Sequence, residues 1–200
     1  MSPHPRLPGE LAPADLADSE ASWPVVGSEG VYASSFIEVR QDVIVDPSGG
    51  EHPRIVVAPR GAVGVLAFDD EDRVLLVEQY RHPVGRRMIE LPAGIFDVVG
   101  ESPVTTAARE LAEEADLRAA TWTPHLVVHA SPGYTTEQLQ VFRATGLSAI
   151  PEDERIPREA EEADLRQWFM PFADAVEAVL AGRITNNLAV AAILAEHARR

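Results

Sequence analysis

Residues Leu91–Leu117, LPAGIFDVVGESPVTTAARELAEEADL, form the stretch that decides how the rest of this 200-residue chain is interpreted. Its second half predicts a helix over Pro103–Ala115, because Ser102 can cap the first turn and proline suits the first helical position. At 3.6 residues per turn, the apolar residues share one face of this helix and its glutamates share the neighbouring face. We therefore expect a helix that packs on a core with one side and presents carboxylates beside it.

Three glutamates of this helix, Glu110, Glu113 and Glu114, lie at positions i, i+3 and i+4, so their carboxylates converge. Like charges at this spacing repel one another by roughly a few tenths of a kcal/mol per pair unless a cation lies among them. Several carboxylate oxygens suit Mg²⁺ or Mn²⁺, and Arg109 can orient one carboxylate through a charge-assisted hydrogen bond. A solvated acidic face is the alternative, but it does not account for the glycine-containing loop before the helix or for the adjacent arginine.

The composition restricts the class of protein. The formal net charge of −15 is opposite to the basic surface that nucleic acids require, so we expect no nucleic-acid partner. The absence of cysteine excludes disulfides, thiol catalysis and cysteine–zinc sites, and it is compatible with a cytoplasmic protein. All 17 basic residues are arginine, which excludes lysine Schiff-base chemistry. No apolar run approaches the roughly 20 residues of a membrane span, so no membrane partner is expected.

The chain divides into three predicted parts. Residues 1–22, rich in Pro, Ala, Ser and acidic residues, predict a loosely ordered leader. Residues 23–59 predict a module of short strands at Val31–Arg40, Asp42–Val45 and Arg54–Val57, with a hairpin turn at Asp46–Gly50. Residues 60–200 predict the main domain, with strands at Gly61–Phe68, Arg73–Gln79, Met88–Leu91, Thr123–Val128, Gln138–Ala144 and Leu165–Met170 and further helices at Pro171–Ala181 and Asn186–Arg199. The predicted class is α+β, a mixed sheet with helices packed on it.

The glutamate-bearing stretch also resembles a known family signature. Its spacing, Gly94-x6-Glu101-x7-Arg109-Glu110-Leu111-x-Glu113-Glu114-x-Asp116-Leu117, resembles that of the Nudix hydrolases, G-x5-E-x7-R-E-U-x-E-E-x-G-U, in which U is a bulky aliphatic residue. One extra residue precedes Glu101, a form that resembles actinobacterial ADP-ribose pyrophosphatases. Asp116 replaces the usual glycine, and we expect it to adopt a left-handed backbone at a modest cost in stability. The resemblance implies a Nudix α/β/α sandwich with an N-terminal antiparallel β module.

Segments outside the signature are similar to the ADP-ribose pyrophosphatase branch of that family: Glu78–His82, Gly85–Arg87, Glu90–Gly94 and Ser131–Gly133, which contains Pro132. This likeness implies Mg²⁺-dependent hydrolysis of ADP-ribose to AMP and ribose 5-phosphate, with Mn²⁺ as a second candidate metal. It also implies a homodimer formed with the help of residues 23–59. Hydrolysis of another nucleoside diphosphate sugar and non-catalytic nucleotide binding remain the alternatives.

The resemblance also implies roles for individual residues. Glu110, Glu114 and the backbone carbonyl of Ala93 would hold the metal, Glu113 would be a further ligand or support them, and Arg109 would orient the carboxylates. Glu162 is the first candidate, and Glu161 the second, for the carboxylate that activates water. The alternative for both is a solvated position in an acidic loop.

The predicted contacts to the substrate are Arg81, Arg86, Arg87, Tyr80, Tyr134 and Glu137. The guanidinium of Arg81 would bind the diphosphate as a fork. The two later arginines would do the same or pair with acidic residues across a dimer interface. The tyrosines would stack on adenine or pack within the protein, and the glutamate would meet a ribose hydroxyl or lie on the surface.

Overall fold

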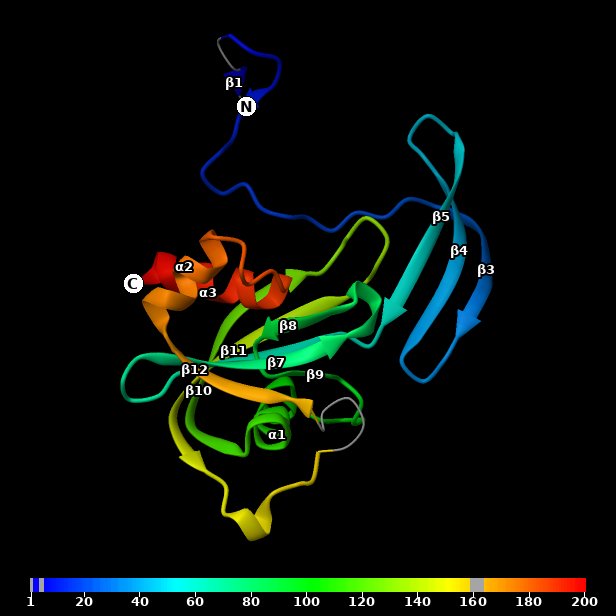
Figure 1. The fold of residues 1–200 in the computed structure, drawn as a ribbon. Helices are drawn as coiled ribbons and strands as arrows, with labels where there is room; N and C mark the ends of the chain where they lie inside the picture. Colours follow the sequence, from blue (N-terminus) through cyan, green and yellow to red (C-terminus); the bar gives the residue numbers. More distant parts are fainter. Residues whose placement is uncertain (1, 4–5, 159–163) are drawn as a thin grey trace.

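A layer of strands separates one helix from a pair of helices in the computed structural model, which describes residues 2–3, 6–158 and 164–200 (Figure 1). The strands are β1 (Ser2–Pro3), β2 (Glu10–Leu11), β3 (Val25–Ala33), β4 (Ile37–Val45), β5 (Glu51–Pro59), β6 (Ala62–Ala67), β7 (Arg73–Arg81), β8 (Arg86–Glu90), β9 (Ala93–Ile95), β10 (Leu117–His129), β11 (Gln138–Ala149) and β12 (Arg166–Pro171). The α-helices are α1 (Pro103–Ala115), α2 (Phe172–Leu180) and α3 (Asn187–Arg199), and the 3₁₀ helices are η1 (His82–Val84) and η2 (Glu152–Glu154).

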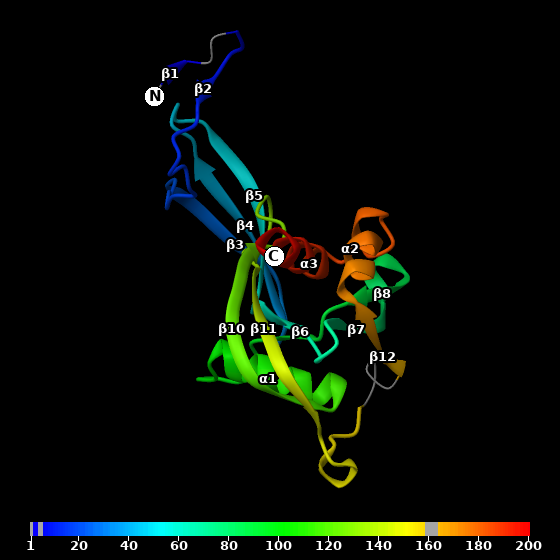
Figure 2. The same cartoon turned by 90° about the vertical axis from the view of Figure 1, so that its left-hand side faces the viewer.

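Two sheets form the main domain. One has the strand order β10-β11-β6-β9 and the other β12-β7-β8. β11 and β6 run parallel, whereas the other neighbouring strands of these two sheets run antiparallel. A separate antiparallel sheet, β3-β4-β5, extends from the side of the main domain (Figure 2). The predicted α+β class with a mixed sheet is confirmed.

Strand β6 shows why the strands lie between helices. Alternate residues such as Val63 and Val65 pack with Leu111 of α1 in one apolar cluster. Leu66 belongs to a second cluster, formed with residues of α2 and α3. Side chains alternate between the two faces of a strand, so a strand that is apolar throughout is buried on both sides. The α/β/α sandwich is confirmed, with α1 below the strands and α2 and α3 above them in Figure 1.

Helix α1 begins and ends where the sequence predicts. The Ser102 hydroxyl accepts a hydrogen bond from the Thr105 N–H at 3.3 Å, and Pro103 occupies the first helical position. Asp116 ends the helix with φ 54° and ψ 35°, the left-handed conformation expected at this position. The capping and the spacing are local, so they determine this helix with little help from the rest of the fold.

The predicted strand Val31–Arg40 is wrong, because the chain turns within it. The Ser34 hydroxyl accepts hydrogen bonds from the N–H groups of Phe36 and Ile37, each at 3.2 Å, and these bonds replace strand pairing. β3 therefore ends at Ala33, and β4 continues without a break through Gln41. The predicted hairpin turn after β4 is confirmed, since the Asp46 carboxylate accepts N–H groups from Ser48 and Gly50.

Three other predictions of secondary structure need correction. The predicted strand Thr123–Val128 is only the middle of β10, in which a register shift between Pro124 and Leu126 accommodates the proline. Likewise β11 extends beyond the predicted Gln138–Ala144 to Ala149. β1 and β2 pair within residues 1–22, where no strand was expected.

Arg200, which follows α3, fastens that helix to α2 and to the turn before β7. The Arg200 guanidinium lies 3.9 Å from the ring centroid of Phe172 and forms two hydrogen bonds with the Asp72 carboxylate, at 2.6 and 2.8 Å. Its Nε donates to Glu196 at 3.1 Å. Stacking and ion pairing thus act on the same side chain. No helix among the described residues is long and apolar enough to cross a membrane.

Replacing Arg200 with alanine should lower the free energy of unfolding by about 1–2 kcal/mol, because it removes the stacked cation and its ion pairs together. For a chain of this size the melting temperature should fall by a few degrees. Thermal unfolding followed by circular dichroism measures the change. Arg118→Ala, which removes an exposed ion pair to Glu154, is the control, and equal stability of the two variants would contradict this role of Arg200.

Candidate active site

Close packing of α1 against β9 places Glu110 directly over Gly94. A Cβ atom at Gly94 would lie 2.0 Å from the carboxyl carbon of Glu110 and 2.1 and 2.3 Å from its two oxygens. A Cβ atom there would force the Glu110 carboxylate to move, so glycine at this position provides space for that carboxylate rather than a positive φ. Gly94 therefore brings the backbone of β9 against the carboxylate that the sequence assigns to a metal.

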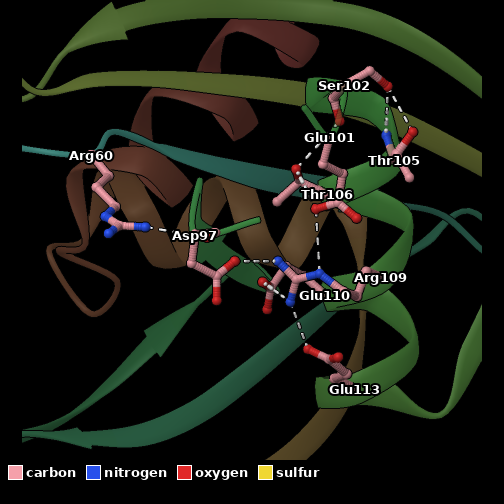
Figure 3. Close-up of polar contacts among 9 residues, drawn as sticks. All are labelled: Arg60, Asp97, Glu101, Ser102, Thr105, Thr106, Arg109, Glu110 and Glu113. Atoms are coloured by element: carbon pink, nitrogen blue, oxygen red, sulfur yellow. Dashed lines mark hydrogen bonds and ion pairs between the residues drawn. The ribbon is translucent and has the colours of Figure 1, made fainter. Parts of the chain in front are cut away.

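Arg109 lies among carboxylates from the helix and from the loop before it (Figure 3). Its guanidinium contacts Glu110 at 2.7 Å, Glu113 at 2.9 Å, Asp97 at 2.9 Å and Glu101 at 3.4 Å. Glu101 also accepts a hydrogen bond from the Thr106 hydroxyl at 2.9 Å. The predicted orienting contacts of Arg109 are thus present, and they join the loop to the helix.

Glu114 is tied to the strand that carries the third predicted metal ligand. Its Oε2 accepts a hydrogen bond from the Ala93 N–H at 2.9 Å. Glu114 is 4% exposed and Glu110 is 7% exposed. The structure therefore brings Ala93, Glu110 and Glu114 together where α1 meets β9.

Burial raises the pKa of the Glu110 carboxyl to about 7, although Arg109 opposes the rise. A carboxylate held in such surroundings needs a further positive charge to stay ionised at neutral pH. The donors at this point are oxygen atoms, the type that Mg²⁺ and Mn²⁺ prefer. Within the described residues, no three acidic or histidine side chains lie close enough together to bind a metal ion as they stand. The fit to a divalent cation therefore rests on the burial and chemistry of Glu110 and Glu114.

Two adjoining cavities meet at β9. A cavity of about 280 Å³ is lined by Gln79, Arg81, Ala93, Gly94, Ile95, Asp97, Arg109, Glu110, Glu113 and Glu114. A second cavity, of about 710 Å³, shares Arg81 and β9 with the first and extends to Glu137 and to residues 185–188 before and in α3. The cavity at the acidic cluster thus adjoins a larger cavity that is big enough for a nucleotide-sized ligand.

Arg81 lies at the junction of the two cavities, and Glu90 holds it there. Its Nη2 lies 2.7 Å from the Glu90 carboxylate, and its Nε lies 3.1 and 3.2 Å from the two oxygens of that group. Glu90 is 3% exposed, whereas the Arg81 side chain is 40% exposed. The buried carboxylate fixes the plane of the guanidinium, and its exposed part borders the site.

The predicted substrate contacts on β7 and β8 divide between two faces. Arg81 and Arg86 are paired in register and share the face that borders the cavities, but of the two only Arg81 lines them. Tyr80 and Arg87 form the adjacent pair and lie on the opposite face, and neither lines the two cavities described above. Arg87 instead pairs with Asp164. This ion pair lies within one chain, so it is neither the predicted phosphate contact nor the predicted pairing across a dimer interface.

Four predicted site residues remain: Glu137, Tyr134, Glu161 and Glu162. Glu137 lines the larger cavity, and burial raises the pKa of its carboxyl. Tyr134 is 57% exposed, and its carbonyl accepts a hydrogen bond from the Val57 N–H at 2.8 Å, so its loop contacts β5. Glu161 and Glu162 lie outside the described residues.

Several residues of the site were not expected from the sequence. Asp97 binds Arg109 from the loop, and no helical spacing relates the two positions. Glu90 carried a signal, since it is a lone charge beside apolar residues, but its arginine partner is nine positions away on another strand. Asn186 and Asn187 line the larger cavity from the start of α3, and Asn186 also caps that helix. Neither asparagine belongs to a chemical motif, so only the packing identifies them.

Replacing Gly94 with alanine should weaken binding of Mn²⁺ or Mg²⁺ by about 10–100-fold, because the new methyl group must displace the Glu110 carboxylate. Isothermal titration calorimetry on the metal-free protein measures the affinity. Gly133→Ala is the matched control, since a Cβ there meets nothing within 4 Å. Metal binding by Gly94→Ala at the affinity of the original protein would remove Glu110 from the metal site.

Comparison with known proteins identifies the family. The NUDIX domain model matches residues 58–189. An ADP-ribose pyrophosphatase of Mycobacterium tuberculosis is 41% identical over 180 residues, which cover 90% of this chain and 86% of that protein. An ADP-ribose pyrophosphatase of Bacillus subtilis is 35% identical over 127 residues, 64% of this chain and 68% of that protein. A solved structure described as an ADP compounds hydrolase superposes with a TM-score of 0.74 at 19% identity, covering 91% of this chain and 96% of that one, and it supports the fold.

The matched region contains β6, β9 and α1, which carry the glycine, the arginine and the glutamates described above. It also extends across both sheets of the main domain and into α3, so the likeness is not confined to the signature stretch. The family assignment and the geometry therefore agree on the same part of the fold. The chain belongs to the Nudix family of hydrolases.

Proposed function

We propose that this protein hydrolyses the diphosphate bond of ADP-ribose to AMP and ribose 5-phosphate. One observation carries the proposal. The carboxylates around Glu110 line a small cavity, and this cavity adjoins the larger one at Arg81. Two similar proteins are named ADP-ribose pyrophosphatase, which supports this substrate. In the reaction, the oxygen of water bonds to one phosphorus while the bridging oxygen leaves with the other product.

Nudix hydrolases generally use divalent metal ions, and we infer Mg²⁺ here, with Mn²⁺ as the second candidate. When bound, the metal would offset the charge of the phosphate oxygens and lower the pKa of water. Glu110, Glu114 and the Ala93 carbonyl would hold it, with Glu113 as ligand or support. Arg109 would keep Glu110 and Glu113 in place through its ion pairs.

The substrate would lie across both cavities, with its diphosphate beside the exposed part of the Arg81 guanidinium. Because Glu90 fixes that guanidinium, little conformational freedom is lost when the phosphate binds. Glu137, which lines the larger cavity, would accept a hydrogen bond from a ribose hydroxyl. Glu162, with Glu161 as the second candidate, would accept the proton of the attacking water.

We also infer a homodimer in which the sheet β3-β4-β5 takes part. This sheet exposes large apolar side chains, including Val31 at 61%, Tyr32 at 58% and the adjacent Phe36 at 65%. Large exposed apolar side chains gathered in one small sheet are typical of protein interfaces. A cytoplasmic location stays a prediction from the composition.

Purified protein with Mg²⁺ should release AMP from ADP-ribose, and Glu114→Gln should lower kcat by at least about 100-fold because a metal-binding charge is lost. The fold should survive, since the amide oxygen of glutamine can still accept the Ala93 N–H. Chromatography of the products and circular dichroism measure the two effects. Glu71→Gln, at an exposed glutamate, is the control.

Other outcomes of this assay identify the alternatives. Faster hydrolysis of a different nucleoside diphosphate sugar would replace the substrate and leave the chemistry unchanged. Binding of ADP-ribose and Mg²⁺ without turnover would favour a non-catalytic binding domain. Near-normal turnover by Glu114→Gln would remove that residue from the metal ligands.

Replacing the exposed Tyr32 with glutamate should convert the dimer into monomers, because a charge would have to be buried at the interface. Size-exclusion chromatography with light scattering measures the mass. Val127→Glu introduces the same charge on an exposed position of β10 and should leave the dimer intact. A monomeric original protein would contradict the inferred homodimer.

A further inference from the structure

His125 of β10 is a buried titratable side chain that lines neither cavity of the candidate active site. It lies in a β-bulge, where the register between β10 and β11 shifts from Pro124 to Leu126. His125 is only 8% exposed, whereas His129 at the end of the same strand is exposed. Because a bulge turns a side chain out of the regular alternation of a strand, we attribute the burial of His125 to this irregularity.

The imidazole of His125 contacts α3 through both of its ring nitrogens. Its Nε2 lies 3.0 Å from the Ala192 carbonyl oxygen, and its Nδ1 lies 2.7 Å from Nη1 of Arg199. A carbonyl oxygen only accepts a hydrogen bond, and a guanidinium only donates one. His125 therefore carries its proton on Nε2 and accepts at Nδ1, which makes the ring neutral.

Charged groups face this ring from α3, from β11 and from the residue after α3. Oε2 of Glu196 lies 3.8 Å from Nδ1 of His125, beyond hydrogen-bond distance. The other oxygen of Glu196, Oε1, accepts from Arg143 of β11 at 3.3 Å and from Arg200 at 3.1 Å. Among the described residues at this point, three guanidinium groups, including that of Arg199, thus surround one carboxylate. This excess of positive charge disfavours a charged histidine.

These surroundings couple His125 to the stability of the fold. Burial lowers the pKa of His125 below its ordinary value, and Arg199 and Arg143 lower it further, although the Ala192 carbonyl and Glu196 oppose them. The unfolded chain therefore takes up a proton at a higher pH than the folded protein does. The stability that neutral His125 contributes is present above about pH 6.5 and is lost as the pH falls from there toward the pKa of the folded protein.

We propose that His125 is a pH-sensitive latch, which holds the C-terminal half of α3 against β10 while it is neutral and releases Arg199 when it is protonated. A proton from solvent on Nδ1 occupies the lone pair that accepts from Arg199. The imidazolium and the guanidinium then repel each other at a separation of 2.7 Å. Oε2 of Glu196, at 3.8 Å, can accept the new N–H after a small shift of the ring.

The latch goes beyond the proposed function and needs no assumption about the substrate. It replaces a contact to the last turn of α3 with a contact to Glu196, about one turn earlier in the same helix. The first residues of α3 line the larger cavity. Acid thus acts on the order of a helix whose other end borders the candidate active site.

Nuclear magnetic resonance tests the protonation state directly. Long-range ¹H–¹⁵N correlation spectra of the ¹⁵N-labelled protein distinguish the two tautomers, and the spectrum of His125→Gln identifies which of the six histidine signals belongs to His125. At about pH 8, His125 should carry its proton on Nε2. In Arg199→Met the pKa of His125 should rise, because the donor and its positive charge are lost together. A proton on Nδ1, or an unchanged pKa in Arg199→Met, would overturn the proposal.

Thermal unfolding at about pH 8 and about pH 5.5 measures the contribution to stability. Glutamine offers a donor and an acceptor but does not titrate, so His125→Gln should lose a few degrees less of its melting temperature on acidification than the original protein. His197→Gln, at an exposed histidine in the last turn of the same helix, is the matched control and should show the full loss. Groups such as Glu110, whose pKa is about 7, are common to all variants and cancel in this comparison.

Equal acid sensitivity of His125→Gln and the original protein would contradict the latch, as would an equal gain in His197→Gln. If His125→Gln does not fold, Arg199→Met provides the comparison. Its arginine is already absent, so acidification should lower its melting temperature less than that of the original protein. A loss as large as that of the original protein would then overturn the proposal.

Hydrogen–deuterium exchange locates the part that is released. After correction for the slower intrinsic exchange in acid, uptake in the last two turns of α3 should be at least about twofold higher at pH 5.5 than at pH 8, with β6 unchanged. The increase should be absent in His125→Gln and present in His197→Gln. An increase of the same size in β6 would show loosening of the whole domain and would refute a latch confined to α3.

Discussion

The packing of the Glu110 carboxylate against Gly94 is the contact on which the rest of the site depends. A carboxylate so deeply buried is costly unless cations compensate it, and Arg109 provides one positive charge at 2.7 Å. A divalent ion would provide more. The absence of a side chain at Gly94 brings β9 close enough for Ala93 to bind Glu114. The missing methyl group at Gly94 thereby leaves the space that the Glu110 carboxylate occupies beside β9.

The position of this contact in the fold makes it rigid. Helix α1 packs through Leu111 on strands whose other face is covered by α2 and α3, so shifting the helix would disturb the apolar cluster that it shares with β6. Sites built on such elements hold their geometry better than sites on loops. Residues that come from loops, such as Asp97 and Arg158, are in turn bound to α1 by ion pairs. The helix is thus the element to which the residues around the proposed metal site are attached.

Predictions from local signals succeeded where the structure is itself local. The bounds of α1 follow from its cap, its proline and its periodicity, all within a few residues of one another. The strand predicted over Val31–Arg40 failed because a single hydroxyl, that of Ser34, can satisfy two backbone N–H groups and turn the chain. Such competition between a side chain and strand pairing is decided by the sheet as a whole and leaves little trace in the pattern of apolar residues.

By itself, the sequence determined the α+β class, the helix that carries the glutamates and the arginine among them, because these depend on spacing along one element. The tertiary structure alone decided which face of β7 and β8 borders the cavities, and so separated Arg81 from Tyr80 and Arg87. It also decided the pairs Arg81–Glu90 and Asp116–Arg158, whose partners lie on different segments. Spacing within one helix is set by covalent geometry, whereas contacts between segments are set by how the whole chain packs.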